Sequence, residues 1–194
     1  MKKAILSLLM LCCAIVMMAQ PQSASGGFKM PETNPQYKDL NYAGDSLEAH
    51  RLDIYLPATG HEKYKVVMVI YGSAWFANNM KAMGYLSIGK PLVDAGFAVV
   101  SINHRSSGDA KFPAQINDVK AAIRYIRAHA EDYHLDTSFI GITGYSSGGH
   151  LSSLAGVTNH MKTHNVGKTT VDIEGNVGHY TDYSSEVDAV VDWF

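Results

Sequence analysis

The stretch Gly144-Tyr145-Ser146-Ser147-Gly148-Gly149 separates an apolar run from a segment with helical spacing. Residues 138–143 predict a short buried strand, and Leu151 and Leu154 share one face of the helix that should follow. Glycines two positions before and after Ser146 are typical of a sharp strand-to-helix turn, because they let neighbouring backbone approach a strained main chain. This context predicts a nucleophile elbow with Ser146 as the attacking oxygen.

Strands and helices alternate along the chain before this turn. Leu52, Ile54 and Leu56 alternate with polar residues, which predicts one strand of a half-exposed opening hairpin. Residues 65–71 and 97–103 are continuous apolar runs, as expected of strands buried on both faces of a parallel sheet. Right-handed crossovers between such strands give a mainly parallel sheet with helices on both faces. The predicted fold class is therefore α/β.

Two helices are expected between the strands. One spans 85–95 and must kink or restart at Pro91. The longer one spans 113–133 and carries an apolar stripe, with charged residues such as Lys120 and Arg124 expected to face solvent.

After the elbow helix, residues 158–185 predict a long polar loop on the active-site side, and 187–194 predict one more buried strand. Ligands of open parallel sheets bind at the carboxyl ends of the strands. Ser146 and the turn at 71–75 both fall at such ends.

The N-terminus predicts export. Lys2 and Lys3 precede an apolar stretch too short to span a membrane comfortably, which is typical of a signal peptide over residues 1–19, cleaved after Ala19. The expected location is secreted or periplasmic, with no transmembrane segment in the mature chain. Leu11 stands where a lipoprotein signal needs a small residue before Cys12.

The remaining chain divides into a flexible Pro-, Ser- and Gly-rich lead-in over 20–36 and one domain over 37–194. The only two cysteines lie inside the predicted signal peptide, so the mature chain should contain no disulfide or cysteine site. A net charge of −2 argues against a nucleic-acid surface. No metal or cofactor site is predicted, because Met161 interrupts the His160/His164 pair where a zinc site needs glutamate. Oligomeric state is not indicated.

A serine that transfers acyl groups needs backbone donors aimed at the oxygen that becomes negative. The N–H of Ser147, at the start of the elbow helix, is one expected donor, and the helix dipole adds to it. The small residues Gly72, Ser73 and Ala74 follow the strand over 65–71 and fit as the second part of this oxyanion hole.

The chain also resembles a known family, the α/β-hydrolase esterases and lipases of the carboxylesterase type, and within it the bacterial feruloyl/acetyl esterase-like group. The resembling segments are 52–57, 71–75, 96–105, 112–124, 144–151 and 184–194. The resemblance implies ester hydrolysis through an acyl-enzyme, an eight-stranded sheet, Ser146 as nucleophile, and Ser73, Ala74 and Ser147 as oxyanion donors. Small-molecule or polysaccharide-linked esters, such as acetyl or feruloyl esters, are the substrates it suggests.

Two departures from the family pattern stand out. Tyr71-Gly72-Ser73-Ala74 replaces the usual His-Gly-Gly-Gly motif. The family's triad acid and histidine follow the elbow on later loops, so both are expected beyond residue 194, and the domain is expected to be truncated before its last strands. His150 should point away from the serine, and Arg105 with Asp118 should form a structural ion pair.

Two other functions stay open at this stage. A serine peptidase of the prolyl-oligopeptidase type shares the elbow, although the segment before Leu52 has no room for its substrate-gating domain. A non-catalytic binding protein that keeps the fold would explain the missing acid and histidine, but not the intact Ser146.

Overall fold

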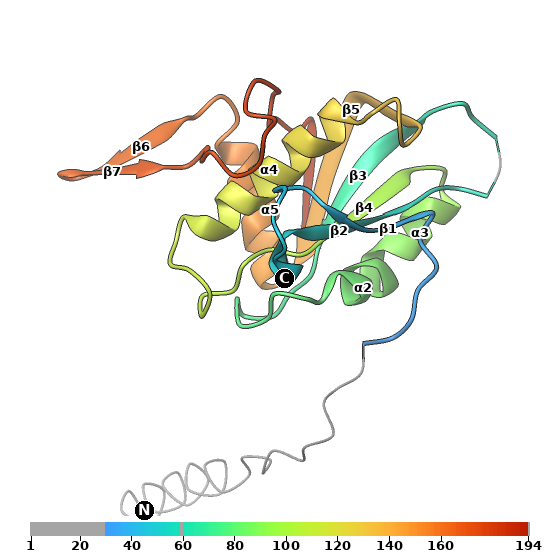
Figure 1. Cartoon of the computed structure of the whole chain (residues 1–194), viewed down its shortest axis with the longest axis horizontal. Coiled ribbons are helices and arrows are strands. Elements are labelled where there is room, and N and C mark those ends of the chain that lie inside the picture. Colours follow the sequence, from blue (N-terminus) through green and yellow to red (C-terminus); the bar gives the residue numbers. More distant parts are fainter. Residues whose placement is uncertain (1–29, 59, 194) are drawn as a thin grey trace, which may run out of the picture.

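A six-stranded sheet forms the centre of the molecule in the computed structural model, which describes residues 30–58 and 60–193 (Figure 1). The predicted signal peptide and the lead-in up to residue 29 lie outside the described residues. Residues 30–36 contain no helix or strand. They join the domain through hydrogen bonds of 2.7 Å between Thr33 Oγ1 and Tyr55 Oη, and from Leu56 N to Gln36 Oε1. Within the described ranges, no helix combines the length and the apolar character needed to cross a bilayer.

The strands follow the order β1-β2-β4-β3-β5-β8 across the sheet. They are β1 (Tyr37–Asn41), β2 (Arg51–Tyr55), β3 (Tyr64–Ile70), β4 (Ala98–Ile102), β5 (Leu135–Tyr145) and β8 (Ala189–Trp193). β2 runs antiparallel to both β1 and β4, whereas β4, β3, β5 and β8 are parallel to one another. The opening hairpin and the mainly parallel sheet predicted from the hydrophobic pattern are both confirmed. The expected half-exposure was wrong for β2, because β2 lies between β1 and β4 and four of its five residues are buried.

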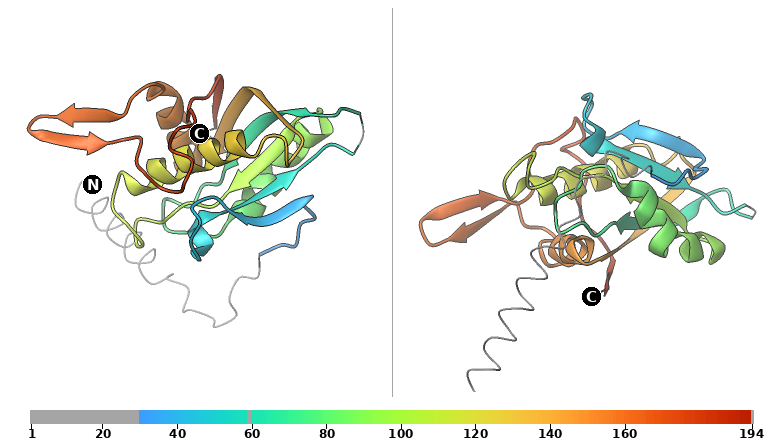
Figure 2. Two further views of the ribbon diagram at one scale, coloured as in Figure 1. Left: turned by 45° about the horizontal axis from the view of Figure 1, so that its top comes forward. Right: turned by 90° about the horizontal axis from the view of Figure 1, so that it is seen from below.

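Helices cover both faces of this sheet (Figure 2). One face carries α4 (Ala114–Ala128) and α5 (Ser147–Val157), and the other carries α2 (Lys81–Gly84), η2 (Tyr85–Gly89) and α3 (Lys90–Asp94); η1 (Glu48–His50) is a short turn before β2. Alternate residues of β3 face opposite layers, since Val66 packs in the core under α4 whereas Val67 packs against the α3 side. A strand buried this way must be apolar at every position, which is why its sequence is a continuous run.

The helical segment before β4 begins at Lys81, earlier than the sequence predicts. Pro91 lies in the first turn of α3, directly after the π-helical turn η2. A proline there removes an N–H that a regular helix would use, and a change of helix type accommodates it. The interruption at Pro91 is therefore a local rewinding.

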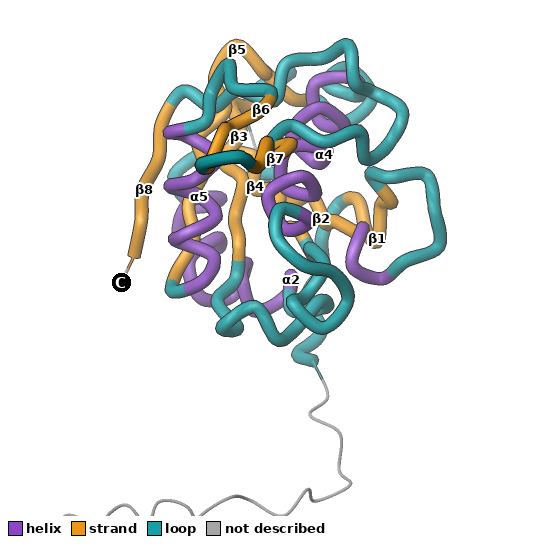
Figure 3. Tube along the Cα trace, turned by 90° about the vertical axis from the view of Figure 1, so that its left-hand side faces the viewer, coloured by secondary structure: helices purple, strands orange, loops and turns teal. Residues whose placement is uncertain are grey.

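The expectation that the last strand is buried was wrong. Val190, Val191 and Trp193 of β8 are 38%, 49% and 55% exposed. β8 lies at one edge of the described sheet and pairs only with β5 (Figure 3). An apolar strand at an edge keeps one side of its backbone and part of its side chains open to solvent.

The segment between α5 and β8 differs from the predicted loop. It contains a hairpin, β6 (Thr163–Val166) and β7 (Thr169–Asp172), that projects from the body of the molecule (Figure 1). The two ends of the whole segment between α5 and β8 meet near the amino end of β8, where Asn159 Nδ2 donates to Val187 O at 2.8 Å. Its middle packs on α4, where Asn117 Nδ2 donates to Ile173 O at 2.9 Å. Both ends of the segment thus lie at the amino end of the strands, whereas its middle reaches Asn117 in the first turn of α4 and Tyr42 after β1. Its expected placement on the active-site side stays a prediction.

Two charged side chains of α4 are buried beneath this segment, contrary to prediction. The side chains of Lys120 and Arg124 are each 1% exposed, and both pair with Glu174. Lys120 Nζ lies 3.1 Å from Glu174 Oε2, to which Ser185 Oγ also donates at 2.7 Å. Helical periodicity predicted solvent exposure for both cations, but residues distant in sequence, Thr158, Glu174 and Ser185, cover them.

Replacing Glu174 with glutamine should destabilise the protein by about 3 kcal/mol, because two buried cations lose their counter-charge. Burial alone would raise the pKa of the Glu174 carboxyl, but the Ser185 hydrogen bond and the Lys120 charge outweigh it and lower that pKa. The stabilisation is therefore complete above the ordinary glutamate pKa and is lost as pH falls through the lowered folded-state value. Urea unfolding from neutral to acid pH measures it.

Glu131→Gln is the matched control, since the Glu131 side chain is 81% exposed and pairs with Lys63 at the surface. Its expected effect is within about 0.5 kcal/mol. Equal destabilisation by the two variants would contradict the importance of the buried cluster.

Candidate active site

Ser146 occupies a strained turn between β5 and α5. Its φ and ψ angles are 53° and −125°, a region that residues with a side chain rarely adopt. Ser146 N donates to Trp193 O at 3.0 Å, and Ser146 O accepts from His150 N at 3.1 Å. The neighbouring strand and the first turn of α5 thus hold the strain, and the residue itself is exposed. This is the geometry expected of a nucleophile elbow.

Glycines around the turn are required by close backbone contacts. A Cβ on Gly144 would overlap the Gly148 carbonyl group, and a Cβ on Gly148 would overlap the carbonyl of Ile70 at the end of β3. Backbone atoms cannot rotate away as a flexible side chain can. The elbow therefore fits against β3 only with glycine at both positions, which confirms the reason inferred from the sequence.

The turn after β3 lies directly beside the candidate nucleophile. A Cβ on Gly72 would be 2.9 Å from Ser146 Cβ. Ser73 is followed in this turn by Ala74 and Trp75, whose φ angles are 49° and 61°. The turn is braced by a 2.9 Å hydrogen bond from Phe76 N to Ser73 O. The structure thus brings together the two segments that the sequence predicts as halves of one site.

Ser73 and Ser147 are joined directly. Ser73 N donates to Ser147 Oγ at 2.9 Å. Ser147 is 3% exposed, and its backbone opens α5. The Ser73 N–H, expected as an oxyanion donor, is therefore already engaged, and the oxyanion roles of Ala74 and Ser147 stay predictions. The hydrogen bond from Ser73 N to Ser147 Oγ could not be predicted from the sequence, because the two residues are 74 positions apart.

Tyr71, which replaces the histidine of the usual motif, spans the same turn. Its hydroxyl donates to Ala77 O at 3.1 Å, and its ring stacks on His104 with centroids 4.9 Å apart. Burial lowers the pKa of His104. The neutral ring donates from Nδ1 to Arg105 O at 2.9 Å. A buried aromatic pair thus supports the turn, and sequence analysis missed it because the two residues are 33 positions apart.

All nine histidines of the chain lie in its described part. His150 is exposed on α5 with its ring edge-on to Trp75 at 5.4 Å between centroids. Within residues 30–58 and 60–193, no histidine forms a hydrogen bond with the Ser146 side chain. His160 pairs with Glu186, and His164 lies in β6 and not on a helix. The described part contains no cluster of metal-binding side chains.

The acidic residues considered in the sequence have structural partners. Asp118 is fully buried and holds Arg105 through contacts of 2.6 to 3.1 Å, which confirms the predicted ion pair. Asp188 accepts a hydrogen bond from Ile140 N at 2.7 Å. Asp192 accepts from Ser153 Oγ at the same distance. None of these carboxylates is hydrogen-bonded to a histidine near Ser146.

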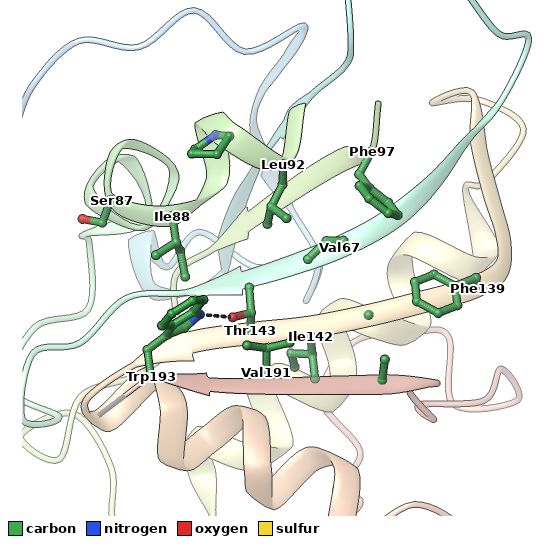
Figure 4. A pocket seen from close by; sticks show the side chains of 13 residues that line it. Val67, Ser87, Ile88, Leu92, Phe97, Phe139, Ile142, Thr143, Val191 and Trp193 are labelled. Carbon is green, nitrogen blue, oxygen red and sulfur yellow. Dashed lines mark hydrogen bonds between the residues drawn. The ribbon is translucent and has the colours of Figure 1, made fainter. Parts of the chain in front are cut away.

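A large apolar cavity lies away from the candidate nucleophile. Its volume is about 520 Å³, and it runs along the sheet face between α3 and β8 (Figure 4). Trp193 lies at one end, where its Nε1 donates to Thr143 Oγ1 at 3.0 Å, and Phe139 lies towards the other. Neither Ser146 nor the 72–75 turn lines it. The cavity is lined mostly by apolar side chains of the sheet and of α3, and it carries no catalytic group.

Comparison with known proteins finds similar proteins that are described as ester hydrolases or carbohydrate esterases. LipM of Mycobacterium tuberculosis, described as a probable carboxylic ester hydrolase, is 39% identical over 124 residues, which are 62% of this chain and 28% of LipM. A bifunctional GH43-CE protein from Bacteroides eggerthii shares 69% identity with a TM-score of 0.80, over 81% of this chain and 20% of that one. A truncated carbohydrate esterase from gut microbiota shares 61% identity with a TM-score of 0.82, over 85% of this chain and 59% of that one.

The chain thus spans between 20% and 59% of the length of these relatives. Its residues 52–194 match the BD-FAE family model. This range begins at the second residue of β2 and includes the turn after β3, the elbow and β8. The chain belongs to the BD-FAE family, a group of α/β-hydrolase esterases.

Proposed function

We propose that the protein to which this chain belongs is an exported serine carboxylic-ester hydrolase that acts through an acyl-enzyme. The observation that carries the proposal is the exposed Ser146, held in a strained conformation at the start of α5 beside the Gly72 turn. Strain of this kind persists where surrounding structure enforces it, and it is typical of functional sites. The predicted signal peptide over residues 1–19 supports export.

The chemistry follows from this geometry. Ser146 Oγ attacks the ester carbonyl carbon while a base takes its proton, and the carbonyl oxygen becomes negative. The N-terminal end of α5 and backbone N–H groups of Ala74 and Ser147 stabilise this charge. Collapse of the intermediate releases the alcohol with that proton and leaves an acyl group on Ser146. Water then hydrolyses the acyl group by the same route.

Esters attached to polysaccharides are the proposed substrates. Two of the most similar solved structures are described as a GH43-CE protein and a carbohydrate esterase. Both acetyl and feruloyl groups fit this proposal.

A peptidase is the competing candidate, and a substrate panel separates the two. The longest gene product containing this chain should release acetate or ferulate from acylated xylo-oligosaccharides and should hydrolyse p-nitrophenyl acetate. It should leave a proline p-nitroanilide intact. Cleavage of the anilide without hydrolysis of any ester would overturn the proposal.

A further inference from the structure

The hydroxyl of Ser147 forms a hydrogen bond between the two halves of the site. It accepts the N–H of Ser73 at 2.9 Å across 74 positions of sequence. Ser147 is 3% exposed, so water does not compete readily for this bond. In the described part of the chain, this is the hydrogen bond that connects the turn after β3 to α5.

The turn needs such an anchor. Ala74 and Trp75 both adopt positive φ angles, each at a cost of about 1 kcal/mol or more, and such conformations persist only when neighbouring contacts enforce them. The bonds from Phe76 N to Ser73 O and from Tyr71 Oη to Ala77 O shape the turn internally. Neither of these bonds joins the turn to α5. The Ser147 hydroxyl forms the hydrogen bond that does so, beside the ring contact of Trp75 with His150.

The same bond changes which donors are free. An N–H already bonded to Ser147 Oγ is not available at full strength to a second acceptor, so the amides of Ala74 and Ser147 remain for the oxyanion. Ser147 then contributes twice, through its own N–H and through the placement of Ala74.

We infer that Ser147 is a positioning residue whose hydroxyl, by holding the Ser73 amide, sets the Ala74 N–H at the distance from Ser146 that the oxyanion requires. This inference rests on the proposed acyl-transfer function. Donors aimed at an oxyanion act only once charge has developed, so their misplacement lowers kcat and leaves substrate binding intact.

The test is Ser147→Ala in the longest gene product that contains this chain. Alanine keeps the backbone N–H and adds no atom, so the fold should persist. We expect kcat on p-nitrophenyl acetate to fall about 10- to 100-fold with KM within about twofold. Affinity for a trifluoromethyl ketone, which forms the tetrahedral adduct, should fall in parallel. Should the alanine variant fail to fold, Ser147→Cys retains a weaker acceptor and should give a smaller loss of kcat.

Ser152→Ala is the matched control. Ser152 is fully buried on the same helix, and its hydroxyl donates to Gly148 O at 2.9 Å without touching the turn after β3. Its kcat should stay within about twofold of the unmodified protein. An unchanged kcat in Ser147→Ala, or equal losses in both variants, would overturn the inference. Ester hydrolysis that persists in Ser146→Ala would instead refute the proposed function itself.

Discussion

Replacing Ser146 with alanine will reduce ester hydrolysis by at least about a thousandfold, because no other group supplies the attacking oxygen. A fluorophosphonate probe should label the unmodified protein at Ser146 and leave the variant unlabelled. The measurement requires the longest gene product that contains this chain. The thermal midpoint should stay unchanged, since alanine at a φ of 53° is as strained as serine.

Ser146→Gly provides the matched control for loss of activity without loss of fold. Glycine adopts this backbone conformation freely, so the variant should be equally inactive and more stable by about 1 kcal/mol. Gain of stability with loss of function is the mark of strain kept for a catalytic role. Labelling that persists in either variant would show that another residue is the nucleophile.

The chain by itself is expected to turn over p-nitrophenyl acetate no faster than its own Ser146→Ala variant. A serine hydroxyl is a poor nucleophile at neutral pH unless a base within hydrogen-bond reach accepts its proton. Each histidine described here lacks such a contact, and His150 rests edge-on against Trp75. We therefore propose that the acid and the histidine of the triad come from outside residues 30–193.

Comparing the chain with the longest gene product in the same assay tests this expectation. If the chain alone shows Ser146-dependent turnover that rises with pH near the histidine pKa of about 6.5, one of its nine histidines is the base. His150→Asn would then be the first variant to measure, because His150 begins the second turn of the elbow helix.

The elements nearest the site could be predicted because their causes are local. The continuous apolar runs of β3 and β4 require burial on both faces, and the glycines at 144 and 148 require a tight turn against β3. These patterns sufficed to place Ser146 and the Gly72–Trp75 turn at the carboxyl ends of parallel strands. The internal arrangement of the site could not be predicted, because the Ser73–Ser147 hydrogen bond and the Tyr71–His104 stack join residues that are distant in sequence.

The sequence by itself determined the class of fold, the order of its strands along the chain and the residue at the elbow. Hydrophobic period and glycine position express these directly. Only the tertiary structure decided that Lys120 and Arg124 are buried and that β8 is exposed. Burial depends on what covers a residue. The segment that contains Glu174 covers Lys120 and Arg124 on α4, whereas in the described sheet β8 pairs with β5 on one side only. Such contacts are set by non-local packing, which no local pattern encodes.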